Sequence, residues 1–257
     1  MTEPALLDVQ AVSRSFGKFQ ALSQVSLKVE SGRLCALIGP NGSGKTTFYN
    51  VVSGRYPPTA GRVLFEGRDI TPTPAHRRVE MGLLRSFQIT TIFPALTVLE
   101  NVLVPLVVHH GRSFACLCAI AGQRDLAEEA EGILARVGLT GQSCRVVSTL
   151  AYGDKRLIEI AIVLARRPRL VLLDEPTAGM NPEETERMIR LIQDLSERSE
   201  TTFFITEHDM KVVFSVAEKI FVLNQGRLLA EGTPEEIRAN PEVRRAYLGG
   251  SLDAAGL

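Results

Sequence analysis

The chain has 257 residues, which is enough for one large domain or for a domain that carries an inserted lobe. Lysine plus arginine and aspartate plus glutamate number 29 each, so the formal charge is zero, which argues against electrostatic binding to nucleic acid or anionic lipid. The four cysteines include no C-x-x-C pair, so we expect free thiols in a reducing compartment rather than disulfides or a zinc site.

The sequence pattern indicates neither a signal peptide nor a membrane-spanning segment. The first residues, Met1–Pro4, lack the basic and apolar regions of a signal peptide. The longest apolar run, Phe114–Ala121, is far shorter than the ~20 residues that cross a bilayer as a helix. We therefore expect a chain that is soluble by itself and that reaches a membrane only through a partner.

Strand-like and helix-like patterns alternate along the chain. Apolar and β-branched runs predict strands at Leu6–Val12, Val25–Val29, Leu34–Ile38, Arg62–Phe65, Leu170–Leu173, Thr202–Thr206, Ile220–Leu223 and Arg227–Glu231. Apolar residues at helical spacing predict helices over Thr46–Ser53, Ala127–Val137, Lys155–Ala165, Pro182–Ser196 and Met210–Ala217. Apolar strands between helices favour the α/β fold class, with a parallel sheet covered by helices on both faces.

Capping residues mark the starts of three helices. The residues Thr97–Glu100 have the spacing of a capping box and open an apolar stretch. Asn181 followed by Pro182 fits an N-cap and a first helical position, and Thr233–Glu236 repeats that pattern near the C-terminus. We therefore expect helices to begin at these points.

The loop at residues 39–46 reads Gly-Pro-Asn-Gly-Ser-Gly-Lys-Thr, which matches G-x-x-x-x-G-K-[ST] between a predicted strand and a predicted helix. Its glycines let backbone N–H groups point at phosphate oxygens, Lys45 reaches the β- and γ-phosphates, and the Thr46 hydroxyl can ligate Mg²⁺. A plain glycine turn is the alternative, but the complete match predicts binding of a nucleoside triphosphate. We expect the phosphates to contact Gly39, Pro40, Asn41, Gly42, Ser43, Gly44, Lys45, Thr46 and Thr47.

Two acidic residues, Asp174 and Glu175, follow the buried strand Leu170–Leu173. The carboxyl end of a strand in an α/β sheet lies at the ligand crevice. We expect Asp174 to hold Mg²⁺, largely through water, and Glu175 to face the γ-phosphate and orient the attacking water. A carboxylate is a weak base at neutral pH, so its role is alignment plus proton acceptance. The alternative is two solvated acids at a strand end.

Three single residues are weaker candidates. His208 follows the strand Thr202–Thr206 and can reach the γ-phosphate or the attacking water if the strand joins the same sheet. Gln88 follows the apolar segment Leu84–Phe87, and Phe16 can stack on an adenine face. Taken alone, they are more typical of a structural histidine, a surface amide and a core aromatic residue.

The segment 89–166 separates the glycine loop from Asp174 by far more chain than two parts of one site need, and its pattern is mostly helical. We interpret it as an inserted helical lobe without strands. Within it, Leu150–Asp154 precedes a predicted helix, and the small residues around Gly153 offer a second anion site at its N-terminus. We expect this site to lie too far from Lys45 to serve the same nucleotide in one chain, so another subunit completes the pocket. A simple helix cap is the alternative.

In their order along the chain, these motifs resemble those of an ATP-binding cassette ATPase. Phe16 matches the aromatic loop of that family, residues 39–46 its Walker A motif and Gln88 its Q-loop. The signature, Walker B, D-loop and H-loop motifs are matched by Leu150–Asp154, Leu173–Pro176, Ala178–Asn181 and His208. The resemblance covers almost the whole chain.

This resemblance implies a P-loop ATPase core at residues 1–88 and 167–235, with N-terminal antiparallel strands and a mixed or parallel sheet. It also implies a helical subdomain at 89–166 and a C-terminal helical tail at 236–257. Two copies face head to tail and close over two ATP molecules, each held between the Walker A motif of one copy and the signature of the other. The implied catalytic residues are Glu175, His208 and Gln88; Mg²⁺ is held by Thr46, Gln88 and Asp174; and ATP also contacts Phe16, Ala151, Tyr152, Gly153 and Asp154.

Several phrases resemble more narrowly the ATP-binding subunits of branched-chain amino acid importers: Gly82–Gln88, Leu96–Val102, Leu150–Asp154, Glu207–Met210 and Arg245–Gly249. Relatives that serve urea or short-chain amide uptake or lipopolysaccharide export share parts of this set. The resemblance implies an ATPase that drives uptake of branched-chain or related hydrophobic amino acids from the cytoplasmic face of the inner membrane. The implied partners are a second ATPase subunit, identical or a sister chain, two transmembrane permease subunits and, indirectly, a periplasmic substrate-binding protein.

Three positions depart from the common family pattern: Ala151 replaces the signature serine, Asn181 the D-loop aspartate and Phe16 the commoner tyrosine. The first two are typical of this subfamily, so we do not interpret them as inactivation. A soluble cassette that acts on ribosomes or DNA is the alternative. Such proteins usually carry two cassettes, a long coiled-coil insertion or a basic patch, which this sequence lacks. An interaction protein that binds ATP without turnover is disfavoured by Glu175 and His208.

Overall fold

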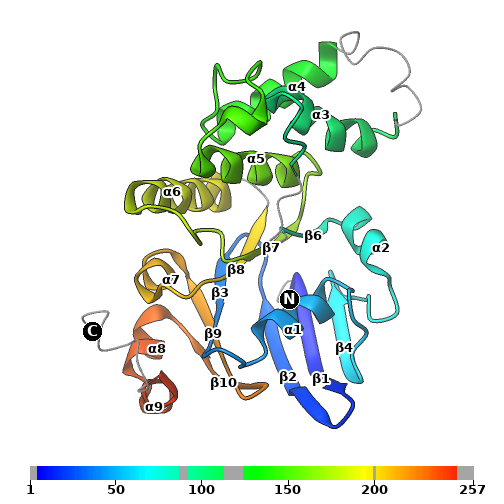
Figure 1. Cartoon of the computed structure of the whole chain (residues 1–257). Coiled ribbons are helices and arrows are strands. Elements are labelled where there is room, and N and C mark those ends of the chain that lie inside the picture. The colour runs from blue at the N-terminus through cyan, green and yellow to red at the C-terminus, as the bar shows by residue number, and fades with distance from the viewer. Residues whose placement is uncertain (1–4, 87–91, 113–123, 199–200, 248–257) are drawn as a thin grey trace. The chain divides into compact units, whose positions relative to one another are not determined.

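The computed structural model describes residues 5–86, 92–112, 124–198 and 201–247 (Figure 1). The chain divides into two compact units, and each is described by itself. The first unit comprises Met1–Arg85, Arg169–Pro176 and Ile192–Leu257; the second comprises Ser86–Pro168 and Thr177–Leu191. The second unit therefore includes a segment after the acidic pair that was not part of the predicted lobe. Gln88 lies outside the described residues.

The first unit contains a six-stranded sheet in the order β10-β9-β3-β8-β7-β6. Its pairs are parallel except for the β9–β10 hairpin. Strands β3, β7 and β8 are buried at every residue, as strands covered on both faces must be. The bounds are Leu34–Ile38 for β3, Leu83–Arg85 for β6, Leu170–Asp174 for β7, Thr202–Thr206 for β8, Lys219–Asn224 for β9 and Arg227–Gly232 for β10.

A second sheet in the same unit is antiparallel, in the order β2-β1-β4-β5. Its strands are β1 (Leu7–Phe16), β2 (Phe19–Val29), β4 (Ala60–Phe65) and β5 (Arg68–Asp69). The strand pattern alone favoured a parallel sheet, whereas the family resemblance implied N-terminal antiparallel strands, and this part of the chain is antiparallel. Only Gly17 and Lys18 separate β1 from β2, whereas parallel neighbours need a crossover of about a dozen residues or more.

Helix α1 (Lys45–Val52) begins inside the glycine loop, and its apolar residues Phe48, Tyr49, Val51 and Val52 are buried. They belong to one core cluster with residues of both sheets. Packing against two sheets fixes the helix and thereby the loop that precedes it. The short helix α2 (Ala75–Glu80) follows β5.

Among the described residues of the first unit, helices also follow β8. They are α7 (Met210–Val216), α8 (Pro234–Ala239) and α9 (Pro241–Tyr247), and the C-terminal part of α6 (Pro182–Arg198) also belongs to this unit. Helix α8 starts with a capping box between Thr233 and Glu236. This confirms the predicted helix start at Thr233–Glu236.

The second unit is helical. It holds α3 (Val98–His109), α4 (Arg124–Arg136), a 3₁₀ turn at Val147–Thr149, α5 (Tyr152–Leu164) and the first turns of α6. Over its described residues, the only β pairing is a single bridge between Thr97 and Val146. The capping box of α3 is formed, because the Thr97 side chain accepts from the Glu100 N–H and the Glu100 carboxylate accepts from the Thr97 N–H. No helix in the described parts of the chain is both long and apolar enough to cross a membrane.

Candidate active site

A cavity of about 330 Å³ opens above the glycine loop in the first unit. The loop, the acidic pair at the end of β7 and the histidine after β8 all border it, so the structure brings together three motifs that lie far apart in the sequence. Its lining residues are Phe19, Ala21, Asn41, Gly42, Ser43, Gly44, Lys45, Thr46, Thr47, Asp174, Glu175 and His208.

Space requires glycine at two positions of the loop. A Cβ atom on Gly39 would fall on the carbonyl oxygen of Leu223, and one on Gly44 would lie 2.8 Å from the carbonyl oxygen of Ala21. Both neighbours are backbone atoms of adjacent strands, so they cannot move aside as a flexible side chain can. The loop is therefore held in its curled conformation by the strands around it.

Lys45 folds back over its own loop. Its ammonium donates to the carbonyl oxygens of Gly39 and Pro40, at 2.6 and 3.2 Å. Burial lowers the pKa of Lys45, while the carboxylates of Glu175 and Asp174 act to raise it. The Ser43 hydroxyl is buried and has no hydrogen-bond partner among the described residues. A lysine ammonium and a hydroxyl without a partner among the described residues, both at one loop, fit the oxygens of a phosphate chain.

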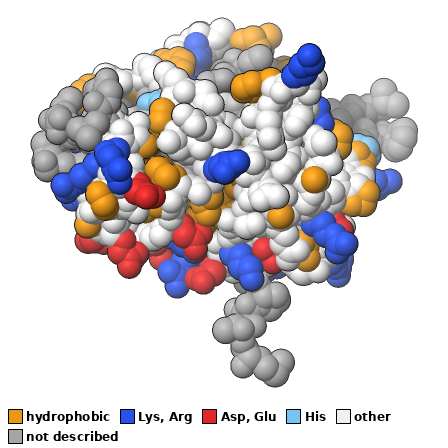
Figure 2. All heavy atoms as spheres, turned by 90° about the horizontal axis from the view of Figure 1, so that it is seen from below, with side chains coloured by type: hydrophobic (Ala, Val, Ile, Leu, Met, Phe, Trp, Pro, Cys, Tyr) orange, Lys and Arg blue, Asp and Glu red, His pale blue; other side chains and the backbone are white. Residues whose placement is uncertain are grey.

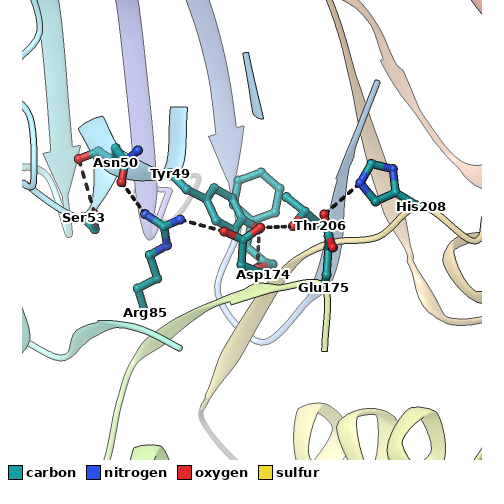
Figure 3. Close-up of polar contacts among 9 residues, drawn as sticks. Tyr49, Asn50, Ser53, Arg85, Asp174, Glu175, Thr206 and His208 are labelled. Carbon is teal, nitrogen blue, oxygen red and sulfur yellow. Dashed lines mark hydrogen bonds and ion pairs between the residues drawn. The ribbon is translucent and has the colours of Figure 1, made fainter. Parts of the chain in front are cut away.

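The acidic pair is positioned by strand register. Asp174 is opposite Thr206 in the parallel pair β7–β8, so Glu175 and His208 leave the sheet at the same edge. The Asp174 carboxylate accepts hydrogen bonds from the Thr206 hydroxyl and from the Arg85 guanidinium, both at 2.6 Å (Figure 3).

Glu175 has a backbone φ of +50°, in the left-handed region that costs a non-glycine residue roughly 1–2 kcal/mol. Its N–H donates to the Thr206 carbonyl oxygen at 2.9 Å. Its Oε1 lies 2.8 Å from Nε2 of His208 (Figure 3). Strained backbone persists where the surroundings hold it and is found at functional sites. Here it places a carboxylate and an imidazole in contact at the rim of the cavity.

The aromatic ring at the cavity is not the predicted one. Among the described residues that line the cavity, Phe19 is present and Phe16 is not. The Phe16 ring packs edge-on against Tyr56, with the Arg14 guanidinium 4.7 Å from its centroid. Phe19 is 67% exposed and is paired with Phe16 across the β1–β2 turn. Only knowledge of where that turn falls could have drawn attention to Phe19.

The residues proposed as a second anion site lie in the second unit, at the start of α5. The helix begins at Tyr152 rather than at the predicted Lys155, with Ala151 as its extended N-cap. Tyr and Gly are weak helix formers, which is why the pattern suggested a later start. The first turns of α6 hold this end: the Gly153 N–H donates to the Glu184 carboxylate at 3.3 Å, and Asp154 pairs with Arg187 at 3.2 Å.

The residues present fit a magnesium ion that is shared with a nucleotide. Over the described residues, no cluster of three or more His, Cys, Asp or Glu side chains could hold a metal ion by itself. Thr46 and Asp174 nevertheless border the same cavity as the glycine loop. A hydroxyl and one carboxylate, completed by phosphate oxygens and water, match the ligands that Mg²⁺ prefers at nucleotide sites.

Comparison with known families and proteins agrees with this geometry. The family model described as ABC transporter matches residues 22–178, and the model described as branched-chain amino acid ATP-binding cassette transporter matches residues 227–253. The chain is 41% identical to the high-affinity branched-chain amino acid transport ATP-binding protein BraF of Pseudomonas aeruginosa, over 97% of this chain and 99% of that protein. It is 34% identical to the lipopolysaccharide export system ATP-binding protein LptB of Acidithiobacillus ferridurans, over 95% and 97%.

Solved structures show the same fold. The ADP conformation of an ATP-binding cassette of an ABC transporter superposes with a TM-score of 0.83 at 29% identity, covering 96% of this chain and all of that one. A dimeric ATP-binding cassette in a post-hydrolysis state, bound to ADP and phosphate, superposes with a TM-score of 0.73 at 25% identity, covering 89% and 98%.

Proposed function

This chain belongs to the ABC transporter family, in its branched-chain amino acid group, and from that membership we propose that it is the ATP-hydrolysing subunit of an importer of branched-chain or related hydrophobic amino acids. The observation that carries the proposal is the cavity at which the glycine loop, Asp174, Glu175 and His208 converge. The match of residues 227–253 to the branched-chain group supports the substrate class.

The residues of the cavity have distinct roles in this proposal. The loop N–H groups and Lys45 bind the phosphates, and Glu175 orients a water molecule and accepts its proton. His208, in contact with Glu175, fixes that carboxylate and reaches toward the γ-phosphate. Thr46 and Asp174 would hold Mg²⁺, and the ion would neutralise part of the phosphate charge. Phe19, rather than Phe16 alone, is placed to contact the base.

We further propose that two ATPase subunits, identical or sister chains, pair in the working transporter and bind two permease subunits on the cytoplasmic face of the inner membrane. The dimeric relative with ADP and phosphate supports pairing. A periplasmic substrate-binding protein acts indirectly, and residues 89–101 transmit motion to a permease helix.

Basic and acidic side chains are interspersed on the face seen in Figure 2, which does not favour a nucleic-acid partner.

The test replaces Glu175 with glutamine in the full chain. We expect steady-state ATP hydrolysis to fall by about 100-fold or more, because alignment and proton acceptance are lost, while ATP binding persists. Glu183→Gln, an exposed neighbour on α6, is the matched control and keeps wild-type turnover. Near-normal turnover of Glu175→Gln would contradict the role of this residue. Unchanged ATP affinity in Lys45→Ala would contradict the role of the loop.

Lipopolysaccharide export is the second candidate function, because the match to LptB covers nearly the whole chain. Reconstitution with the permease subunits of each kind of system separates the two. Uptake of leucine into vesicles, dependent on ATP and lost in Glu175→Gln, supports the importer. Lipid-linked cargo extraction without leucine uptake supports the exporter.

A further inference from the structure

Arg85 contributes a buried positive charge next to the acid that faces the metal site. It is the last residue of β6, and its side chain is 6% exposed, against 7% for the side chain of Asp174. Its Nη2 donates to Oδ2 of Asp174 at 2.6 Å (Figure 3). A buried ion pair contributes little net stability, since desolvation offsets most of the attraction, so this arrangement calls for a reason other than stability.

The other side of the guanidinium is tied to the helix that follows the glycine loop. Its Nη1 donates to Oδ1 of Asn50 at 2.7 Å, and its Cζ lies 5.6 Å from the centroid of the Tyr49 ring (Figure 3). The Tyr49 hydroxyl is itself fixed, because it donates to the Phe204 carbonyl oxygen at 2.6 Å. The guanidinium therefore joins β6, β7 and α1 in one geometry.

Both oxygens of the Asp174 carboxylate are consequently engaged. Oδ1 accepts from Thr206 and Oδ2 accepts from Arg85, each at 2.6 Å. Such short bonds hold the carboxylate in one orientation, and the adjacent cation offsets its charge. A carboxylate held in this way attracts a second cation less strongly than a free one and is not at liberty to turn toward it.

We propose that Arg85 is a positioning residue of the hydrolytic site. It orients Asp174 and moderates its charge, so that Mg²⁺ is held through water in the productive arrangement rather than captured tightly by a freed carboxylate. This inference rests on the proposed ATPase function and adds a residue to which the sequence motifs gave no role in the site.

The test compares Arg85→Gln with wild type in the full chain, using a fluorescent ATP analogue. In EDTA, the affinity for the analogue stays within about twofold, because the loop is untouched. On titration with Mg²⁺, the half-saturating concentration for the fluorescence change falls about tenfold, because an uncompensated carboxylate attracts the ion more strongly. The kcat for ATP falls about tenfold while KM is unchanged, since the freed Asp174 holds the ion in a non-productive place.

Two further variants separate charge from orientation. Arg85→Lys keeps the charge but lacks the fork that reaches Asn50, so the Mg²⁺ requirement returns toward wild type and kcat recovers only in part. Asn50→Ala keeps both charges, so kcat falls a few-fold with an unchanged Mg²⁺ requirement. Arg169→Gln, which breaks a half-exposed pair with Glu66 in the same unit, is the control and leaves all readouts unchanged.

A Mg²⁺ requirement that is unchanged or higher in Arg85→Gln overturns the inference. A loss of affinity for the ATP analogue that is as large in EDTA as in Mg²⁺ also overturns it. If Arg85→Gln does not fold, as judged by its melting curve, Arg85→Lys and Asn50→Ala decide: wild-type kcat in both overturns the inference. A wild-type chain without Mg²⁺-dependent hydrolysis refutes the proposed function instead. An active wild type with an unshifted Arg85→Gln refutes the role of Arg85 alone.

Discussion

Single residues of the glycine loop are constrained by the backbone of neighbouring strands. A Cβ atom added to Gly39 would collide with the Leu223 carbonyl oxygen of β9. Gly32 also has a positive φ, but a Cβ atom added there would meet no neighbouring atom. The two glycines are therefore required for different reasons. At Gly32 only backbone strain opposes a side chain, but at Gly39 a side chain would also collide with the backbone of β9, so the glycine loop or that strand must shift.

Gly39→Ala should accordingly weaken ATP binding by about tenfold or more, because crowding of this kind costs ~1–3 kcal/mol and the loop absorbs it. Gly32→Ala, with φ of +72° and no atom near its Cβ, should lower stability by about 1 kcal/mol and leave ATP affinity unchanged. Isothermal titration with ATP and a melting curve measure the two effects. Equal ATP affinity in the two variants would contradict the spatial account.

The cysteines offer a second prediction at this scale. Burial raises the pKa of Cys35 from 9.0 to about 12, with the charge of Lys219 acting in the opposite direction. The folded state therefore favours the protonated thiol, and the stability this contributes is complete below pH 9 and is lost as the pH rises toward 12. We expect iodoacetamide at pH 8 to leave Cys35 unmodified in the native chain while it modifies the exposed Cys144. Peptide mass spectrometry measures the labelling, and a sample in guanidinium is the control in which both cysteines react. Equal labelling of Cys35 and Cys144 without denaturant would refute the prediction.

The cavity residues that could be predicted are those in contiguous motifs. Residues 39–46, Asp174 and Glu175 carry their meaning in local spacing, and the cavity brings them together with His208. Arg85 and Phe19 could not be found in this way. The role of Arg85 depends on β6 pairing with β7, and that of Phe19 on the position of the turn between β1 and β2. Both are long-range facts that no local pattern contains.

Among the elements, α1 has its C-terminal end completed by a side chain from another helix. Its last turn carries no basic residue of its own. Arg78 of α2 supplies one, donating to the carbonyl oxygens of Val51 and Val52 at 2.9 and 2.7 Å. The same guanidinium also donates to the carbonyl oxygens of Thr73 and Thr71. A buried cation that is satisfied by four carbonyl groups anchors the helix that carries Lys45.

Arg78→Met should therefore destabilise the first unit by about 3 kcal/mol, because it leaves buried carbonyl groups without donors. Burial lowers the pKa of Arg78 to about 10, so the group is still charged at neutral pH. Arg77→Met, on the exposed side of the same helix, is the control and should cost under about 0.5 kcal/mol. Urea unfolding followed by circular dichroism measures both. Matching midpoints for the two variants would show that Arg78 does not anchor α1.

The elements that could be predicted most closely from the sequence are the buried strands with continuous apolar runs. Strand β8 falls at its predicted residues, and β7 and β9 differ by a residue or so at their ends. The strands β5 and β6, with two and three residues, are too short to show periodicity, and α2 and α9 are single short helices. The antiparallel pairing of β1, β2 and β4 was expected only from the family resemblance, because strand runs alone do not tell which partner each strand takes.

For the whole molecule, the division of the chain into two compact units places one more segment in the helical unit than the predicted lobe at 89–166 contained. The boundary falls between Pro176 and Thr177, directly after the acidic pair, and α6 runs from the second unit into the first. The sequence indicated an insertion from the length of chain between motifs. The assignment of Thr177–Leu191 to the helical unit depends on contacts such as Glu184 with Gly153 and Arg187 with the Gly138 carbonyl oxygen. These contacts join residues that are distant in sequence.

Each unit holds one part of the proposed chemistry, and pairing of two chains can be tested by mixing inactive variants. Lys45→Ala removes the cation proposed to bind phosphate in the first unit, and Gly153→Asp places a negative charge at the start of α5 in the second. Each variant alone should lack turnover. Mixed dimers form one intact and one doubly defective site, so an equal mixture should recover about a quarter of wild-type hydrolysis if the chains pair at random as twofold-symmetric dimers.

Recovery of this kind arises only if a site takes Lys45 from one chain and the α5 N-terminus from the other. The control mixes Lys45→Ala with Gly132→Asp, which adds the same charge on the exposed side of α4 where a Cβ meets no neighbour. Gly132→Asp should be active alone, and its hydrolysis in the equal mixture should fall only in proportion to its dilution by the inactive variant. If wild type is active and the Lys45→Ala and Gly153→Asp mixture stays inactive, this chain does not complete its own pocket, and the α5 start of a sister ATPase is the next partner to supply.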